Sequence, residues 1–342
     1  METNLYLTAN RAFADGMADM TDYLQGLIDA NPNRTIFLPD GIWRISRPLV
    51  TSAAADKSVS LKLADYAVLK ADEHWKLGEP LVRLGGRDPA KNQNLVGSNY
   101  SFVGGVLDGS GIADGISIDS GRETVIRGTS VKNTRIGIHI AYGANNGSSD
   151  ADISDVNIIG TGKPDSIGIY AEGFDNTFTN IRIGYVWTGV RLESRGNMLR
   201  NVHPLFYGAD YTGYENSIGF YDLAGCNWFD FCYSDHFCTG FRLKNGIHDN
   251  FHNCFAFWYG DGGRGAAHTA TAFATDGSFC SDVTNFKVGF QDDRPACVLS
   301  EGERGGGGHF QFIYIENEKE TIPGDAYRLH LVHTETERKV KL

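Results

Sequence analysis

The chain has 342 residues, of which 42 are glycine and 9 are proline, and its formal net charge is −11. Acidic charge repels phosphate backbones and anionic bilayers, which argues against a nucleic-acid partner and against a membrane partner. No segment approaches the roughly 18 apolar residues of a membrane helix. Acidic Glu2 stands where a signal peptide would be basic. We therefore expect either a cytoplasmic protein or a secreted one that has lost its signal.

Six cysteines all fall in the second half of the chain, without the close paired spacing of a zinc site. We expect free thiols, and we expect neither a metal nor another cofactor. Cys232 and Cys254 occupy the same position of successive repeats described below, so we expect them to pack as core thiols.

The first predicted element is an amphipathic helix over 19–30, for which Asp19 or Thr21 can serve as the N-cap. Thr35–Leu38 and Ile42–Ile45 follow, separated by Pro39-Asp40-Gly41. Two short apolar runs around such a turn predict a β-hairpin.

Beyond residue 100 the sequence repeats a polar residue, a spacer, a large apolar residue, a spacer and often Asn. The apolar centres, which we call the ladder residues, are 21 to 32 residues apart and are Phe102, Val125, Ile153, Phe178, Leu199, Phe229, Phe251, Val283 and Phe310. A second signature, glycine before alternating apolar residues, begins at Gly115, Gly137, Gly168, Gly189, Gly219 and Gly240. Two strands that keep phase at this period predict coils that bury their apolar residues against neighbouring coils.

Asparagine closes the first signature in four repeats, at Asn180, Asn201, Asn253 and Asn285. A polar functional track would give this pattern. Stacked turns favour it more strongly, because amides at equivalent turns hydrogen-bond to one another and tolerate the left-handed conformation. We expect a structural ladder of amides.

The segments 14–30 and 35–45, together with the repeats, resemble the pectate-lyase-like right-handed parallel β-helix superfamily, which includes carbohydrate-active enzymes and phage tailspikes. The resemblance implies an all-β solenoid with a short N-terminal capping helix. Its expected parts within a single domain over 1–342 are the cap helix and hairpin in 10–50, the rungs in 51–315, and C-terminal strands and a tail in 316–342. The catalytic motifs of polygalacturonases and pectate lyases are not matched, so no particular reaction follows.

Seven positions after the ladder residue, five successive repeats carry rings at Tyr185, Phe206, His236, Trp258 and Phe290. The stripe suits stacking on sugar faces, and it equally suits ring packing within the wall of the β-helix. Inserted loops follow the stripe on both sides of the short rung 233–236, and such loops are where binding residues concentrate.

A polysaccharide site needs aromatic rings, polar side chains and two carboxylates that act as acid and base. We predict Asp235 and Asp261 as that pair, with Asp210 or Glu215 as a substitute and His236 as a helper. The predicted substrate-binding residues are Tyr185, Tyr211, Tyr233, Trp258, Arg264, His268 and Asp292. Arg264 and His268 would neutralise an acidic sugar, act as the base of an elimination, or only stabilise their loop.

The leading hypothesis is a carbohydrate-active enzyme that cleaves or rearranges glycosidic bonds of a poly- or oligosaccharide, as a glycoside hydrolase or intramolecular glycosyl transferase. A polysaccharide lyase is the alternative. A non-catalytic glycan-binding or virion receptor-binding solenoid would use the same surface, and a purely structural solenoid is the third class. An exposed end after 327–331 would be shielded in a homo-oligomer, for which we take a trimer as the working hypothesis.

Overall fold

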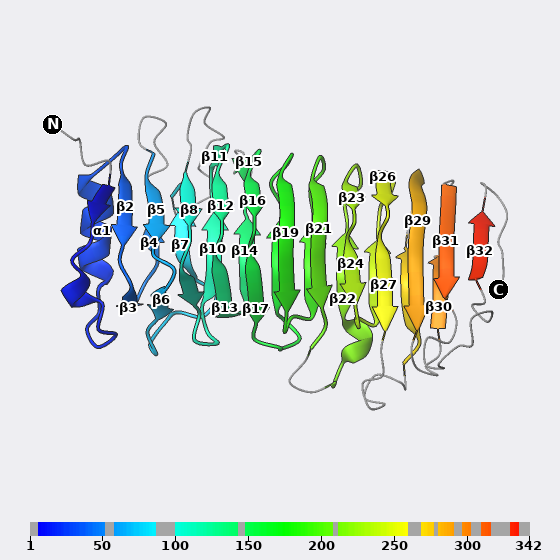
Figure 1. Cartoon of the computed structure of the whole chain (residues 1–342), viewed down its shortest axis with the longest axis horizontal. Coiled ribbons are helices and arrows are strands. Elements are labelled where there is room, and N and C mark those ends of the chain that lie inside the picture. Colours follow the sequence, from blue (N-terminus) through cyan, green and yellow to red (C-terminus); the bar gives the residue numbers. More distant parts are fainter. Residues whose placement is uncertain are drawn as a thin grey trace. The chain divides into compact units, whose positions relative to one another are not determined.

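Short parallel strands stacked rung upon rung make up both units of the computed structural model (Figure 1). Unit 1 comprises Met1–Thr161 and Gly168–Ile181, and unit 2 comprises Gly162–Ile167 and Arg182–Leu342. The structure describes residues 6–51, 58–86, 100–142, 148–207, 211–258, 268–276, 280–290, 296–301, 309–315 and 329–334. Of the strand pairings described, only that of β31 with β32 is antiparallel. The predicted parallel β-helix with a short N-terminal helix is confirmed.

In unit 1 a short strand and a 3₁₀ turn precede the helix, and rungs of short strands follow it. Its elements are β1 (Tyr6–Thr8), η1 (Arg11–Phe13), α1 (Thr21–Ala30), β2 (Thr35–Leu38), β3 (Gly41–Ile45), β4 (Leu49–Val50), β5 (Ser60–Leu63), β6 (Ala67–Ala71), β7 (Pro80–Leu84), β8 (Ser101–Val103), β9 (Val106–Asp108), β10 (Asp114–Ile118), β11 (Gly121–Arg122), β12 (Val125–Arg127), β13 (Ser130–Thr134), β14 (Ile136–Ile140), β15 (Ser148–Ser149), β16 (Asp152–Ser154) and β17 (Asn157–Gly160). The boundary between the units falls within β18 (Ile167–Ala171) and β19 (Thr177–Gly184).

Unit 2 repeats the same rung. Its elements are β20 (Thr188–Leu192), β21 (Met198–Leu205), η2 (Tyr214–Asn216), β22 (Ile218–Asp222), β23 (Trp228–Asp230), β24 (Tyr233–Asp235), β25 (Thr239–Leu243), β26 (Ile247–His252), β27 (Phe255–Trp258), β28 (Ala270–Thr275), β29 (Cys280–Phe290), β30 (Ala296–Glu301), β31 (His309–Ile315) and β32 (Leu329–Thr334). Over the described part of the chain, no helix has the length and apolar character needed to cross a bilayer.

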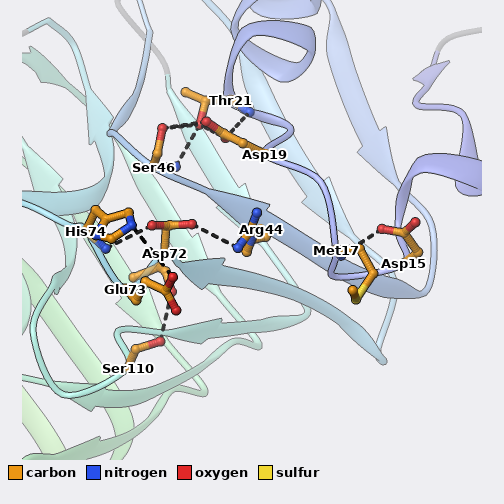
Figure 2. A network of polar contacts seen from close by, with 11 residues as sticks. Asp15, Met17, Asp19, Thr21, Arg44, Ser46, Asp72, Glu73, His74 and Ser110 are labelled. Carbon is orange, nitrogen blue, oxygen red and sulfur yellow. Dashed lines mark hydrogen bonds and ion pairs between the residues drawn. The ribbon is translucent and has the colours of Figure 1, made fainter.

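The start of α1 is tied to the end of β3 by a polar network (Figure 2). Asp19 accepts hydrogen bonds from the Thr21 N–H at 2.9 Å and from the Ser46 hydroxyl at 2.6 Å. The N-cap position is Met20, which makes no side-chain cap hydrogen bond, so the prediction of Asp19 or Thr21 as the N-cap is wrong. Asp19, one residue earlier, nevertheless satisfies the N–H of Thr21 in the first helical turn. The same network holds the next rung, because the Arg44 guanidinium lies 3.1 Å from the Asp72 carboxylate.

The two strands after the helix form as predicted, but they do not make a hairpin. β2 pairs in parallel with β1 and β5, whereas β3 pairs in parallel with β6. The Pro39-Asp40 turn bends the chain into the next side of the rung instead of reversing it. Each strand therefore finds its partner one rung away, and the hairpin prediction is wrong.

The inward ladder is confirmed with one change of register. Phe229 pairs with Phe251 in unit 2, and both side chains are buried. In unit 1 the predicted Val125 points outward, and its neighbour Ile126 pairs with Phe102 and is buried. Because side chains alternate along a strand, a slip of one residue exchanges the two faces.

The second signature needs glycine because neighbouring chain segments approach it closely. A Cβ atom at Gly219 would stand 2.2 Å from the hydroxyl oxygen of Ser234 and 2.6 Å from the backbone oxygen of Gly240. No side chain fits at such a distance. The glycine column of β22 and β25 thus lets the two walls of the unit 2 core close on each other.

The predicted amide ladder is confirmed by its backbone conformation. All four asparagines have φ between 53° and 56°, namely Asn180, Asn201, Asn253 and Asn285. In unit 2 the Asn285 amide donates to the Asn253 side-chain oxygen at 2.6 Å. We call Asn201, Phe231, Asn253 and Asn285 the corner column of unit 2, since each stands two residues after a ladder residue.

A pair of buried carboxyl groups, Asp222 and Asp249, lies inside unit 2 and shares a hydrogen bond. Asn227 joins them, because its side-chain amide donates to Asp222 and its backbone N–H donates to Asp249, both at 2.8 Å. Burial and the charge of Asp222 raise the pKa of Asp249 to about 8. Asp249 is therefore the protonated partner at neutral pH.

The four cysteines whose side chains the structure describes are free, and Cys232 and Cys254 are buried in the unit 2 core. This confirms the predicted packing of these two thiols on adjacent rungs. Burial raises the pKa of the Cys254 thiol well above its ordinary value, so it stays protonated and unreactive.

Replacing Asp19 tests the hydrogen bonds that it accepts at the start of α1. We expect Asp19→Ala to lower the free energy of unfolding by about 1 kcal/mol at pH 7. Hydrogen bonds from Ser46 and Thr21 outweigh burial and lower the pKa of Asp19, so its contribution is present above pH about 4 and is lost as the pH falls. Urea unfolding at pH 7 and pH 3 measures the loss of stability and its dependence on pH, with the substitution of exposed Asp22 by Ala as the control. Equal effects of the two substitutions at pH 7 would contradict this role.

Replacing Asp249 tests the buried carboxyl pair. A folded pKa of about 8 means that stability falls as the pH rises from about 4, where unfolded Asp ionises, to about 8. Asp249→Asn removes this loss of stability and keeps the hydrogen bonds with the Asn227 N–H and with Asp222. We therefore expect the substitution to stabilise the protein by about 1 to 3 kcal/mol at pH 8 and hardly at all at pH 4. Denaturation curves at both pH values test this against exposed Asp282→Asn. Destabilisation at pH 8 would refute the shared proton.

Candidate functional site

The site is built on three neighbouring strands of unit 2, β21, β24 and β27. They pair in parallel, with Leu205 opposite Asp235 and Asp235 opposite Phe257. Ser234 points inward against Gly219, so its neighbours in β24, Tyr233 and Asp235, point to the other face. One strand thus presents a phenol and a carboxylate side by side.

Asp235, predicted as a catalytic residue, lies between two imidazoles. Its Oδ2 is 3.6 Å from His203 Nε2, and its Oδ1 is 3.6 Å from His236 Nδ1. The Asp235 side chain is only 10% exposed, and that of His236 only 2%. Within the described residues, Asp235 Oδ1 and His203 Nε2 are buried polar atoms that make no hydrogen bond. Such atoms are costly to bury, so this carboxylate and this imidazole differ from ordinary packed polar side chains.

Electrostatics keep this carboxylate ionised although it is buried. Burial acts to raise the pKa of Asp235, but the interactions with His203 and His236 outweigh burial and lower it. At neutral pH Asp235 is therefore an anion that can accept a proton or attack an electrophile, and it cannot donate a proton.

Rings stack beside the carboxylate. His203 lies against Tyr233 with ring centroids 4.2 Å apart, and Tyr233 lies against Phe255 at 5.0 Å. Phe257 packs against Phe255 at 5.4 Å. All four side chains are half-buried, which gives the outer face of these strands an aromatic surface next to Asp235. His203, Phe255 and Phe257 were not predicted, although they stand in the same outward columns as Tyr233 and Asp235.

A second group of predicted residues packs close to His236. Tyr214, in η2, is buried and donates its hydroxyl to the His236 backbone oxygen at 2.8 Å. His268 lies near the Tyr214 ring, at 5.8 Å, and its Nε2 is 3.8 Å from the half-exposed carboxylate of Glu215. Tyr211 contacts the same Tyr214 ring at 5.2 Å. The structure therefore brings Tyr211, Glu215 and His268 together, and Tyr214 links them to the Asp235 rung.

The predicted aromatic stripe is largely part of the protein interior. Phe206, His236 and Trp258 are at most 2% exposed. Trp258 is fully buried, with its indole N–H donating to the Phe237 backbone oxygen at 2.8 Å, so no face of its ring is free for a sugar. Tyr185 differs, because it is 41% exposed and lies 4.8 Å from the ring of Tyr207. The side chain of Phe290 lies outside the described residues. Of the four stripe side chains that the structure describes, Tyr185 alone is left as a candidate for stacking on a ligand.

Four predicted site residues lie outside the described residues: Asp210, Asp261, Arg264 and Asp292. The proposed partner of Asp235 in a carboxylate pair, Asp261, is among them. The described part of the site thus consists of one buried carboxylate, two histidines next to it, and a row of rings.

Comparisons with solved structures find the same fold. A double mutant of the tailspike protein of E. coli bacteriophage HK620 matches with a TM-score of 0.65 and 12% identity, over 89% of this chain and 65% of that one. A Geobacillus virus E2 protein, ORF18, matches with a TM-score of 0.58 and 14% identity, over 96% and 63%. An alginate lyase from Paenibacillus sp. str. FPU-7 matches with a TM-score of 0.58 and 15% identity, over 88% and 99%.

This chain therefore spans less than two thirds of the length of the two viral proteins. At 12% to 15% identity the three matches show the fold alone, and they agree with the β-helix resemblance of the sequence. No family model matches the chain, and no curated protein matches it.

Proposed function

We propose that the protein is a carbohydrate-active enzyme that cleaves a poly- or oligosaccharide, with Asp235 at its centre. The observation that carries the proposal is the ionised, buried Asp235 carboxylate between His203 and His236, beside the exposed edge of a ring stack. Rings cover apolar sugar faces, and a carboxylate of lowered pKa handles protons or attacks carbon. Structural neighbours include the HK620 tailspike, solved in complex with a hexasaccharide, and an alginate lyase.

Hydrolysis is the reaction that we propose first. An anionic carboxylate serves either as the base that takes a proton from the attacking water or as the nucleophile at the anomeric carbon. Asp235 fits both roles because its pKa is lowered. The acid that protonates the leaving oxygen must then be a different group, and Asp261 remains our proposal for it, with Glu215 as the substitute.

Elimination is the second candidate, and the contact of His203 with Tyr233 favours it. In this reaction a base removes the C5 proton of a uronate, the C4–O bond breaks, a C4–C5 double bond forms, and an acid protonates the departing oxygen. A neutral histidine can act as the base and a phenol as the acid. Asp235 would then hold the His203 imidazole in place.

Replacing Asp235 tests the centre itself. We expect Asp235→Asn to lower kcat by about 10²- to 10⁴-fold, since the amide cannot accept a proton, while binding stays within about threefold. Alginate, polygalacturonate, dextran and smooth E. coli lipopolysaccharide are suitable first substrates, assayed by new reducing ends. Asp152→Asn is the matched control, because Asp152 is an exposed aspartate on β16 of unit 1 and has no part in the proposed site. Full activity of Asp235→Asn would exclude this residue from catalysis.

Product analysis separates the two reactions. For hydrolysis we expect each new reducing end to carry solvent oxygen, with no unsaturated sugar, and Tyr233→Phe to retain activity within about tenfold because the phenol only stacks. Elimination instead gives an unsaturated, ultraviolet-absorbing end, and loss of the phenol acid would cost about 100-fold. Mass spectrometry of products formed in heavy-oxygen water distinguishes the two reactions, because it detects both the labelled reducing ends and the unsaturated ends. Unsaturated ends together with a severe Tyr233→Phe defect would replace hydrolysis by elimination.

A further inference from the structure

Phe231 breaks the corner column of unit 2. It stands between β23 and β24, where Asn201 and Asn253 occupy the equivalent places of other rungs. Its φ is 53°, the left-handed conformation that the asparagines share. Its side chain is 52% exposed, the most exposed phenylalanine among the described residues.

Phenylalanine has three costs at this position. A bulky side chain in the left-handed region is strained where Asn is tolerated. The column also loses amide hydrogen bonds of the kind that Asn285 makes to Asn253 at 2.6 Å. Finally, an apolar ring faces water, and within the described residues it contacts no other ring. Backbone strain and an exposed apolar ring that no stabilising contact compensates are typical of functional sites.

The surroundings of Phe231 connect it to the proposed active site. Tyr233 and Asp235 follow it in the same rung and face outward on β24. On its other side, Asp230 lies 3.7 Å from Arg200 and 3.3 Å from the His252 ring. The exposed ring therefore stands between an aromatic surface and a group of charged hydrogen-bonding side chains.

We propose that Phe231 is an accessory saccharide subsite, on which a sugar ring stacks while its neighbour in the chain lies at Asp235. This inference rests on the proposed function and extends it around the corner of the rung. A single exposed ring offers far less than the roughly 1,200 Å² that a stable protein interface buries. It matches the apolar face of one sugar, with Asp230, Arg200 and His252 as partners for its hydroxyl groups.

The decisive variant is Phe231→Asn, which restores the corner amide. We expect its Tm to rise by about 2 °C, because strain is relieved and amide hydrogen bonds return. We expect its Kd for polysaccharide to rise about fivefold, because stacking is lost. Affinity electrophoresis in gels containing alginate, polygalacturonate, dextran or smooth E. coli lipopolysaccharide measures the Kd. Phe231→Trp, which keeps an aromatic face, should retain wild-type retardation.

Two controls isolate the subsite. Asn180→Phe places the same ring at an exposed left-handed corner of unit 1 and should lower Tm without changing retardation. Asp235→Asn should lose turnover yet keep retardation. If Asp235→Asn stays active while Phe231→Asn binds weakly, the proposed chemistry fails and the subsite stands.

The inference is overturned if Phe231→Asn is retarded like the wild type, whatever its Tm. Should Phe231→Asn fold poorly, Phe231→Leu replaces it, since leucine keeps apolar bulk without an aromatic face, and unchanged retardation of that variant overturns the inference equally. A wild-type protein retarded by none of the four polysaccharides contradicts both the subsite and the proposed function.

Discussion

Parallel strands in register force every residue of a rung to lie beside its equivalent in the next. Apolar residues such as Phe229 and Phe251 form the core in this way, and the corner asparagines form hydrogen-bonded ladders by the same rule. Because the rule applies to every column, inside or outside, polar and aromatic residues also gather in rows. Asn227 meets Asp249, and Tyr233 meets His203, for this one geometric reason.

The two residues to which we assign a function both depart from the pattern of their columns. Asp235 brings a carboxylate to a buried place, and the two imidazoles around it keep its charge there. Phe231 brings an exposed ring to a corner that asparagine fills elsewhere. Both departures lie in the rung of β23 and β24, four residues apart, and the left-handed conformation and exposure of Phe231 are local costs to stability. A regular scaffold on either side tolerates such costs and holds the altered side chains in place.

The features that recur in every rung could be predicted from the sequence, whereas contacts between side chains of different rungs could not. The core ladder, the amide corners and the buried thiols follow from period alone, whereas Val125 was displaced by one residue because Ile126 is equally apolar. Asp235 was proposed from its short rung between insertions, and its role stays a prediction. His203 and Phe255 were missed, because only the pairing register of the strands places them beside Tyr233. Trp258 was wrongly predicted to contact the substrate, because the same register decides whether its side chain points outward or inward.

The proposed function requires the outer face of β21, β24 and β27 to hold a saccharide against Asp235. A crystal structure of the Asp235→Asn protein, soaked with oligosaccharides from a polysaccharide that retards it in gels, tests this most directly. We expect sugar density over the Tyr233 and Phe255 rings, with one oxygen within hydrogen-bond distance of the side chain at position 235. Sugar bound only on another face, with this one unoccupied, would rule out a saccharide site at Asp235.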